Sequence, residues 1–183
     1  MKLIKLLAIF AASTYLFGCA AGAKQENITY RSYQSATYAQ ELSRNVDVEP
    51  VSGGRETNPA WTSEISNNAF FGALRDSLSA QNLYSDNGRY KLRATLVGVD
   101  QPLFGFDMTV TTRIRYSLID TQTNQTLLEE LVAVPHTATV GDAFSGVARL
   151  RMANEGSAKK NIKNFLNRLA QLKIEPKQVS LVE

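Results

Sequence analysis

The chain has 183 residues, with 20 Lys and Arg against 17 Asp and Glu, and a formal net charge of +3. This length is typical of one domain, and 44% apolar with 20% charged residues excludes a disordered protein. Lys2 and Lys5 lie in an N-terminal leader, so the remainder carries +1, and its basic residues are spread along the chain. A nucleic-acid binder would instead cluster Lys and Arg with aromatic residues on one face, so we expect no nucleic-acid partner.

The N-terminus has the features of an export signal. Two lysines in the first five residues precede an apolar run from Leu6 to Phe17, which is too short to cross a bilayer as a helix. The run ends in Leu16-Phe17-Gly18-Cys19. This motif resembles the lipobox of bacterial lipoproteins, from which it departs at the bulky Phe17.

The resemblance implies a specific maturation of the chain. In that family the leader, here residues 1–18, is removed, the cysteine thiol takes diacylglycerol, and the new N-terminus is acylated. Cys19 would be the lipidated residue. Because Ala20 and not Asp follows it, the resemblance also implies the outer membrane, with the protein anchored on its periplasmic side.

Two other fates of the N-terminus remain open. Ala21-Gly22-Ala23 fits ordinary signal peptidase, and cleavage after Ala23 would release a soluble, cysteine-free secreted domain. The leader could also be an uncleaved core helix. The lone cysteine favours lipidation, because acylation removes an unpaired thiol from an oxidising compartment.

Hydrophobic periodicity divides the rest of the chain into a tether over 19–43, a periplasmic domain over 44–175 and a C-terminal tail over 176–183. Part of the tether could be ordered, because Tyr30, Tyr33 and Tyr38 are able to pack on the domain. The expected elements of the domain are a strand over 44–51, a helix over 62–81, strands over 90–99, 108–118 and 126–138, and a helix over 148–173. Pro135 indicates either that the last strand lies at a sheet edge or that its ladder of hydrogen bonds ends there. Gly156 is expected to kink the last helix or delay its start.

The order β-α-β-β-β-α predicts an α+β fold. We expect a two-layer sandwich in which two amphipathic helices cover one face of a mainly antiparallel sheet. Ala158, Ile162, Phe165 and Leu169 form the apolar stripe of the last helix. The order and the anchor are loosely similar to those of small periplasmic modules of envelope lipoproteins.

The sequence offers no clear catalytic constellation. His136 is the one histidine, no G-x-S-x-G motif occurs, and Asp107, Glu129 and Glu130 fit solvated charges. One histidine and one cysteine exclude the usual zinc and iron–sulfur sites, so we expect no metal and no cofactor. We therefore expect a non-enzymatic protein; the alternative is a periplasmic hydrolase or transferase that uses a serine and His136.

Two segments are candidates for contact with a partner. Leu103, Phe104 and Phe106 belong to a Pro/Gly loop between two strands and would contact an envelope protein or a lipid if exposed; alternatively, the loop folds back over the sheet edge. The second segment is 140–154, which carries Phe144 and places the polar Asn154 on the helical stripe. We predict a binding or assembly module of the envelope.

Overall fold

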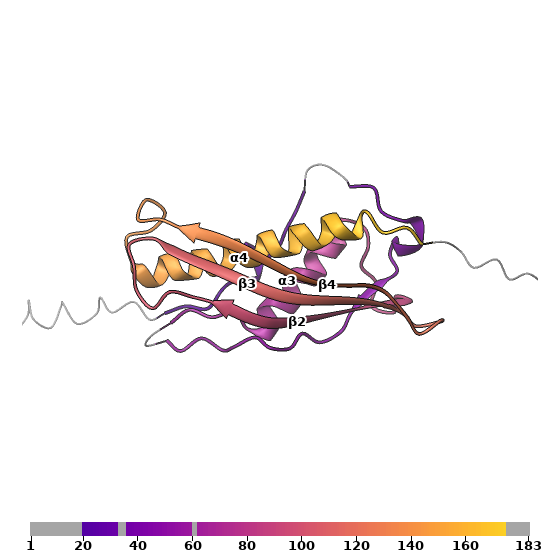
Figure 1. The fold of residues 1–183 in the computed structure, drawn as a ribbon, viewed down its shortest axis with the longest axis horizontal. Helices are drawn as coiled ribbons and strands as arrows, with labels where there is room; N and C mark the ends of the chain where they lie inside the picture. Colours follow the sequence, from indigo (N-terminus) through magenta and orange to yellow (C-terminus); the bar gives the residue numbers. More distant parts are fainter. Residues whose placement is uncertain (1–19, 33–35, 60–61, 175–183) are drawn as a thin grey trace, which may run out of the picture.

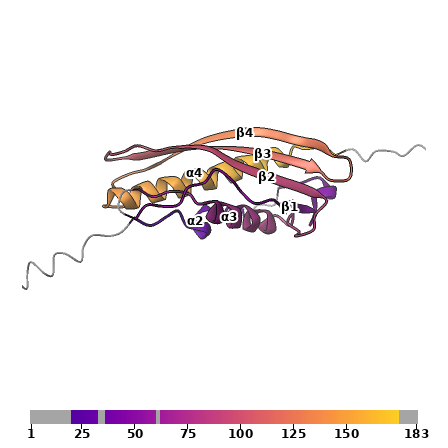
Figure 2. The same cartoon turned by 90° about the horizontal axis from the view of Figure 1, so that it is seen from below.

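The computed structural model describes residues 20–32, 36–59 and 62–174 of the chain. They form one four-stranded sheet in the order β1-β2-β3-β4, with helices on one of its faces (Figures 1 and 2). The elements are α2 (Gln25–Ile28), a 3-10 turn (Gln40–Leu42), β1 (Val46–Val48), α3 (Asn67–Ala80), β2 (Tyr90–Asp100), β3 (Met108–Asp120), β4 (Gln125–Ala138) and α4 (Gly146–Leu169). The expected α+β class, with two long helices over a mainly antiparallel sheet, is confirmed.

The sheet is mixed because its short first strand runs parallel to β2, whereas β2, β3 and β4 form an antiparallel meander. β3 alternates strictly, and Val110, Ile114 and Tyr116 on its helix-facing side are fully buried. β4 is an edge strand, the first of the two alternatives that Pro135 indicates; a proline has no N–H to donate to a further strand.

The two long helices differ from their expected limits for local reasons. α3 starts at Asn67 and not at 62, because Ser66 is the N-cap and its hydroxyl accepts a hydrogen bond from the Ala69 N–H at 3.2 Å. α4 begins at Gly146 and continues through Gly156 as one helix, so the expected delay of its start is wrong.

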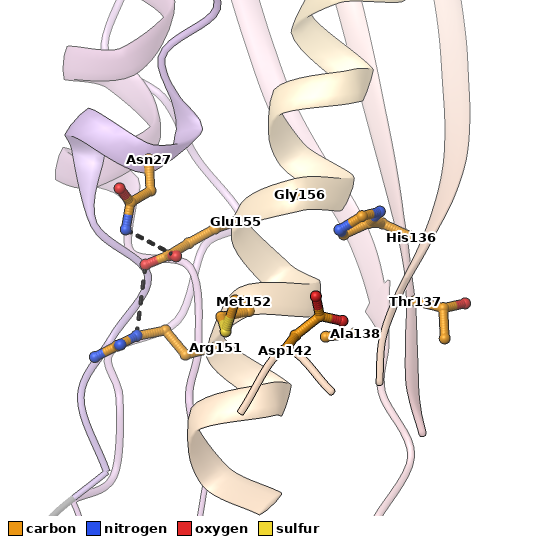
Figure 3. Close-up of a pocket in the computed structure, with 9 residues that line it drawn as sticks. All are labelled: Asn27, His136, Thr137, Ala138, Asp142, Arg151, Met152, Glu155 and Gly156. Atoms are coloured by element: carbon orange, nitrogen blue, oxygen red, sulfur yellow. Dashed lines mark hydrogen bonds and ion pairs between the residues drawn. The ribbon is translucent and has the colours of Figure 1, made fainter. Parts of the chain in front are cut away.

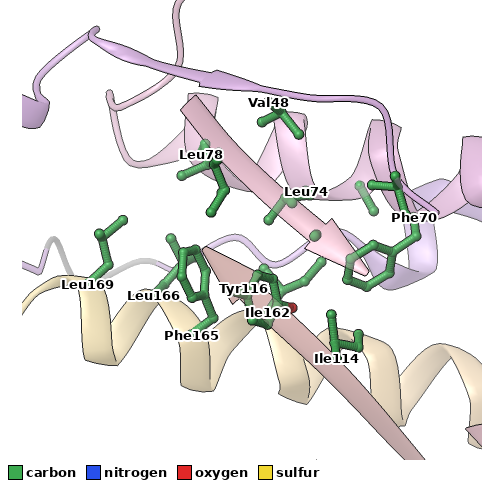
Figure 4. Packing of buried hydrophobic residues seen from close by; sticks show 14 of the residues in the cluster. Val48, Phe70, Leu74, Leu78, Ile114, Tyr116, Ile162, Phe165, Leu166 and Leu169 are labelled. Carbon is green, nitrogen blue, oxygen red and sulfur yellow. The ribbon is translucent and has the colours of Figure 1, made fainter. Parts of the chain in front are cut away.

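The core lies between the sheet and the helices (Figure 4). α4 contributes Ile162, Phe165 and Leu169 from the predicted stripe, all fully buried. The Phe165 ring stacks on Tyr116 of β3, with ring centroids 4.1 Å apart. This contact fixes the rotation of α4 against the central strand.

The expected tether over 19–43 requires correction, because its described residues are packed on the domain. Ala20, Ala23, Ile28 and Leu42 are buried. The Ala20 N–H donates to the Pro59 carbonyl at 2.7 Å, and the Ala23 N–H donates to the Glu64 carbonyl at 2.9 Å. Small side chains let this segment lie close to Thr57, Pro59 and Glu64. The short helix α2, which ends at the fully buried Ile28, then packs beside α3 and α4; Figure 2 shows α2 next to α3.

Several predictions fall outside the described residues, namely the leader over 1–18, the lipidation site Cys19 and the tail over 176–183. Within the described part of the chain, no helix has both the length and the apolar character that a membrane crossing requires.

Candidate functional site

His136, the one histidine of the sequence, lines a pocket of about 430 Å³ (Figure 3). The pocket lies between the end of β4, the following loop, α4 and Asn27 of α2, and its polar lining includes His136, Asp142, Arg151 and Glu155. A histidine and two carboxylates in one pocket are the kinds of group that acid–base catalysis uses.

The Glu155 carboxylate holds the N-terminal segment against α4. Its Oε1 accepts the backbone N–H of Lys24 at 3.0 Å, and its Oε2 accepts the amide N–H of Asn27 at 2.9 Å. Arg151, one turn earlier, lies 3.7 Å from Oε1 (Figure 3). Lys24 is the N-cap position of α2, so a buried carboxylate satisfies the start of this short helix. These bonds fully explain Glu155 as a structural residue.

The His136 imidazole packs on the backbone of α4 at Gly156. A Cβ atom at position 156 would lie 1.8 Å from Cδ2 of the ring and 2.6 Å from Cγ. Burial and the nearby Lys160 charge lower the pKa of His136, while Asp142 opposes the shift. The ring is therefore neutral near pH 7, and the glycine allows it to approach the helix.

Gly156→Ala is expected to destabilise the protein by about 1–2 kcal/mol, because the cost of overpacking exceeds the gain in helix propensity of about 1 kcal/mol. Rotation of the ring does not relieve the contact, since Cγ itself is too close. In the His136→Ala background the same change should stabilise the protein by up to about 1 kcal/mol. Urea unfolding of the four proteins measures both effects, and the same sign in both backgrounds would contradict this packing role.

The remaining groups do not assemble a nucleophile with His136. Ser157 lies on α4 but is buried, and its hydroxyl donates to the Val134 carbonyl at 2.7 Å while accepting the Thr112 N–H at 2.9 Å. The Asp142 carboxylate accepts the Thr139 N–H and hydroxyl at 2.7 and 2.9 Å, and these bonds lower its pKa. Among the residues that the structure describes, no group of three His, Cys, Asp or Glu could hold a metal ion.

A second feature lies at one end of the molecule, where two loops carry large apolar side chains into solvent. Leu103 is 96% exposed, Phe104 and Phe106 are each 85% exposed, and Phe144 is 96% exposed. The first three come from the β2–β3 loop, and Phe144 comes from the β4–α4 loop together with the exposed Val140. The alternative in which the loop folds back over the sheet edge is therefore wrong. We call these five residues the apolar tip.

Arg149 joins the two loops of the apolar tip. Its guanidinium donates to the Ala143 and Phe144 carbonyls at 2.8 and 2.7 Å, and to the Gly105 carbonyl at 3.3 Å. The side chain is buried at the start of α4. The apolar side chains are thus presented by two loops that share one cation.

A larger pocket, of about 710 Å³, lies beside the β2–β3 loop and is lined by Arg55, Glu64, Gln101 and Leu103 among others. Burial raises the pKa of Glu64, against the opposing effects of Arg55 and of a hydrogen bond from Gln101. Gln101 also donates to the Asn154 amide oxygen at 2.9 Å. This pocket was not predicted from the sequence.

The structure shows where the residues singled out from the sequence lie. Leu103, Phe104 and Phe106 share one end with Phe144. Asn154, whose role was left open, is fully buried and donates to the Ser63 carbonyl at 2.8 Å. Glu155 was missed in this role because its partners Lys24 and Asn27 are distant in the sequence, and Arg149 was missed because its partners are backbone carbonyls.

Comparisons with known proteins find solved structures of similar fold but no related sequence family. No protein-family model matches the chain, and no curated protein matches it. A Xanthomonas campestris protein of family DUF330 has a TM-score of 0.54 at 9% identity, covering 78% of this chain and 95% of its own. A Caulobacter crescentus protein provisionally named a lipoprotein has a TM-score of 0.51 at 16% identity, covering 72% of this chain and 90% of its own. A hypothetical protein from Chlamydia trachomatis has a TM-score of 0.53 at 8% identity, covering 69% of this chain and 95% of its own.

At 8–16% identity this likeness establishes the architecture alone. The chain therefore has an α+β fold that other bacterial proteins share, and one of those proteins has lipoprotein in its name.

Proposed function

We propose that this protein is a lipid-anchored lipoprotein of the bacterial envelope, attached through Cys19 to the periplasmic side of the outer membrane. In this proposal it is a non-enzymatic binding or assembly module for an envelope protein or lipid. The anchor follows from Leu16-Phe17-Gly18-Cys19 and its cationic, apolar leader. The shared fold of a protein named as a lipoprotein supports the class.

The observation that carries the choice of cleavage site is the packing of residues 20–23. Ala20 and Ala23 are buried, and their N–H groups donate to carbonyls of the 57–65 loop. Processing at Cys19 keeps this segment in the fold. Cleavage after Ala23 would remove it and expose the surface that it covers, so the fold favours the lipoprotein over the secreted alternative.

The non-enzymatic role rests on how the polar groups near His136 are used. Glu155 and Asp142 accept bonds from backbone N–H groups, Ser157 is buried, and the neutral imidazole packs against a glycine. A Ser/His hydrolase needs a nucleophile within hydrogen-bond reach of its base. We therefore expect His136→Ala to leave the cellular role of the protein unchanged.

The proposal predicts the N-terminal state of the protein isolated from its host. Intact mass should show a membrane-bound species that begins at an acylated Cys19, and Cys19→Ala should abolish the acyl mass because the thiol is the lipid acceptor. A matched control is Ala21→Gln: Ala21 is exposed, so the fold tolerates the change, but the larger side chain spoils the Ala-x-Ala pattern.

The control separates the two cleavage sites. Lipidation at Cys19 should persist in the Ala21→Gln protein. A soluble wild-type species that begins at Lys24, with processing lost in Ala21→Gln, would overturn the proposal and identify a secreted domain.

A further inference from the structure

The attachment point of the anchor lies at the same end of the molecule as the apolar tip. Ala20 is bonded to the Pro59 carbonyl, and the neighbouring Thr62 N–H donates to the Asn58 carbonyl at 3.3 Å. The Thr62 hydroxyl in turn donates to Gln101, the first residue of the β2–β3 loop, at 3.2 Å. Figures 1 and 2 both place the start of the described chain at the end that carries this loop and the start of α4.

The proposed lipid attachment site is separated from this end of the domain by a single peptide unit. Cys19 is the residue before Ala20, and consecutive Cα atoms are about 3.8 Å apart. Ala20 is buried and hydrogen-bonded, and Glu155 fixes the chain again at Lys24. An acyl chain on Cys19 therefore holds this end of the domain at the membrane surface.

We propose that the apolar tip is a membrane-contacting surface, whose Leu103, Phe104, Phe106 and Phe144 side chains enter the interfacial region of the same bilayer that holds the acyl chains. This inference rests on the proposed lipid anchor. Of the seven large apolar side chains exposed in the described part of the chain, five belong to the two loops of the tip: Leu103, Phe104, Phe106, Val140 and Phe144.

The shape and charge of the tip favour a bilayer as its occupant. The side chains extend from loops and not from a flat sheet or helix face, so they can insert individually among headgroups. Arg149 is buried, and its Nη1 and Nη2 donate to three carbonyls while its Nε has no partner in the described part of the chain. The loop acid Asp107 is exposed. Contact should therefore depend on apolar burial, persist at high salt and need no anionic lipid.

The chain permits a direct test because Cys19 is its only cysteine. Lipidation blocks that thiol, so a cysteine introduced by Phe104→Cys or Phe144→Cys is the single site for a polarity-sensitive dye. The matched control is Gln122→Cys, in the exposed β3–β4 turn at the opposite end of β3. The probe is the full lipidated protein in phosphatidylcholine vesicles that contain a spin-labelled lipid.

We expect the vesicles to float all three labelled proteins, with emission at 104 and 144 blue-shifted and quenched several-fold more than at 122, at low and at high salt. Flotation without quenching at 104 and 144 would overturn the membrane contact and leave the anchor standing. Protection from aqueous iodide without lipid quenching would also overturn it, since a second copy or another protein would then cover the tip. Failure to float would overturn the anchor and this inference together.

Discussion

Phe165→Ala is expected to lower the free energy of unfolding by about 3–5 kcal/mol, as for a large aromatic side chain removed from a packed core. Phe165 is fully buried at the centre of the helix–sheet interface (Figure 4). Its ring stacks on Tyr116 at 4.1 Å with an interplanar angle of 13°. The truncation removes apolar burial and leaves a cavity, and it also removes a stacking interaction that contributes about 0.5–1.5 kcal/mol.

Urea unfolding followed by circular dichroism measures this loss. Phe104→Ala is the matched control: it is the same chemical change at a side chain that is 85% exposed, and it should alter stability by no more than about 0.5 kcal/mol. Similar losses for the two variants would show that Phe165 is not at the core of the fold.

The elements of the fold were predictable wherever one periodicity runs for several turns or strand residues. β3 alternates over its whole length, and α4 repeats apolar residues every three or four positions, so both were identified before the structure. Their ends were less accurate because local capping sets them. The sequence predicted α3 from 62, but the Ser66 hydroxyl starts it at Asn67.

The tether was the main error of the sequence interpretation, and its cause is physical. Residues 20–43 have small and polar side chains with little periodicity, which is typical of a linker. Their order depends on distant partners such as Glu155 for Lys24 and Ser77 for Tyr30, and no local pattern encodes these pairs. Tyrosines at 30, 33 and 38 indicated that part of the segment could pack on the domain, and Tyr30 and Tyr38 do pack against the core. Isolated apolar residues without a period do not, however, show where a segment packs.

The candidate site was partly predictable. Three large apolar residues in a Pro/Gly loop marked the β2–β3 connection, but solvent exposure depends on whether the rest of the fold covers that loop. The pairing of the loop with Phe144 depends on the Arg149 bonds to carbonyls of both loops, and backbone acceptors leave no sequence signature. The proximity of the proposed anchor to this loop depends in turn on the packing of Ala20, a contact that an interpretation of this segment as a tether does not predict.

A buried polar layer on α4 was recognised only in part, because the sequence placed Asn154 on the helical stripe but not Ser157 or Asn161. Asn154, Ser157 and Asn161 continue the stripe of Phe165 at intervals of three and four residues, and all are fully buried. Asn161 accepts the Tyr116 hydroxyl at 3.0 Å and donates to the Thr112 and Val132 carbonyls at 3.1 and 2.8 Å. One amide therefore bonds to β3 and β4 together and sets the position of the helix along them.

Asn161→Ala is expected to cost about 2–4 kcal/mol, because it leaves the Tyr116 hydroxyl and strand carbonyls without partners inside the protein. Burial raises the pKa of Tyr116 well above its ordinary value, so the hydroxyl keeps its proton and remains a donor that needs an acceptor. In the Tyr116→Phe background that orphaned donor is absent, and Asn161→Ala should cost about 1–2 kcal/mol less.

A double-mutant cycle measured by urea unfolding isolates this coupling from the loss of the amide itself. Equal costs of Asn161→Ala in the two backgrounds would show that the hydroxyl–amide bond contributes nothing to stability, and the loss would then belong to the carbonyls of Thr112 and Val132. A positive coupling would identify a polar contact that orients α4 on the sheet, and with it the loop that precedes the helix. The placement of Phe144 at the apolar tip would then depend on a hydrogen bond in the core as well as on Arg149.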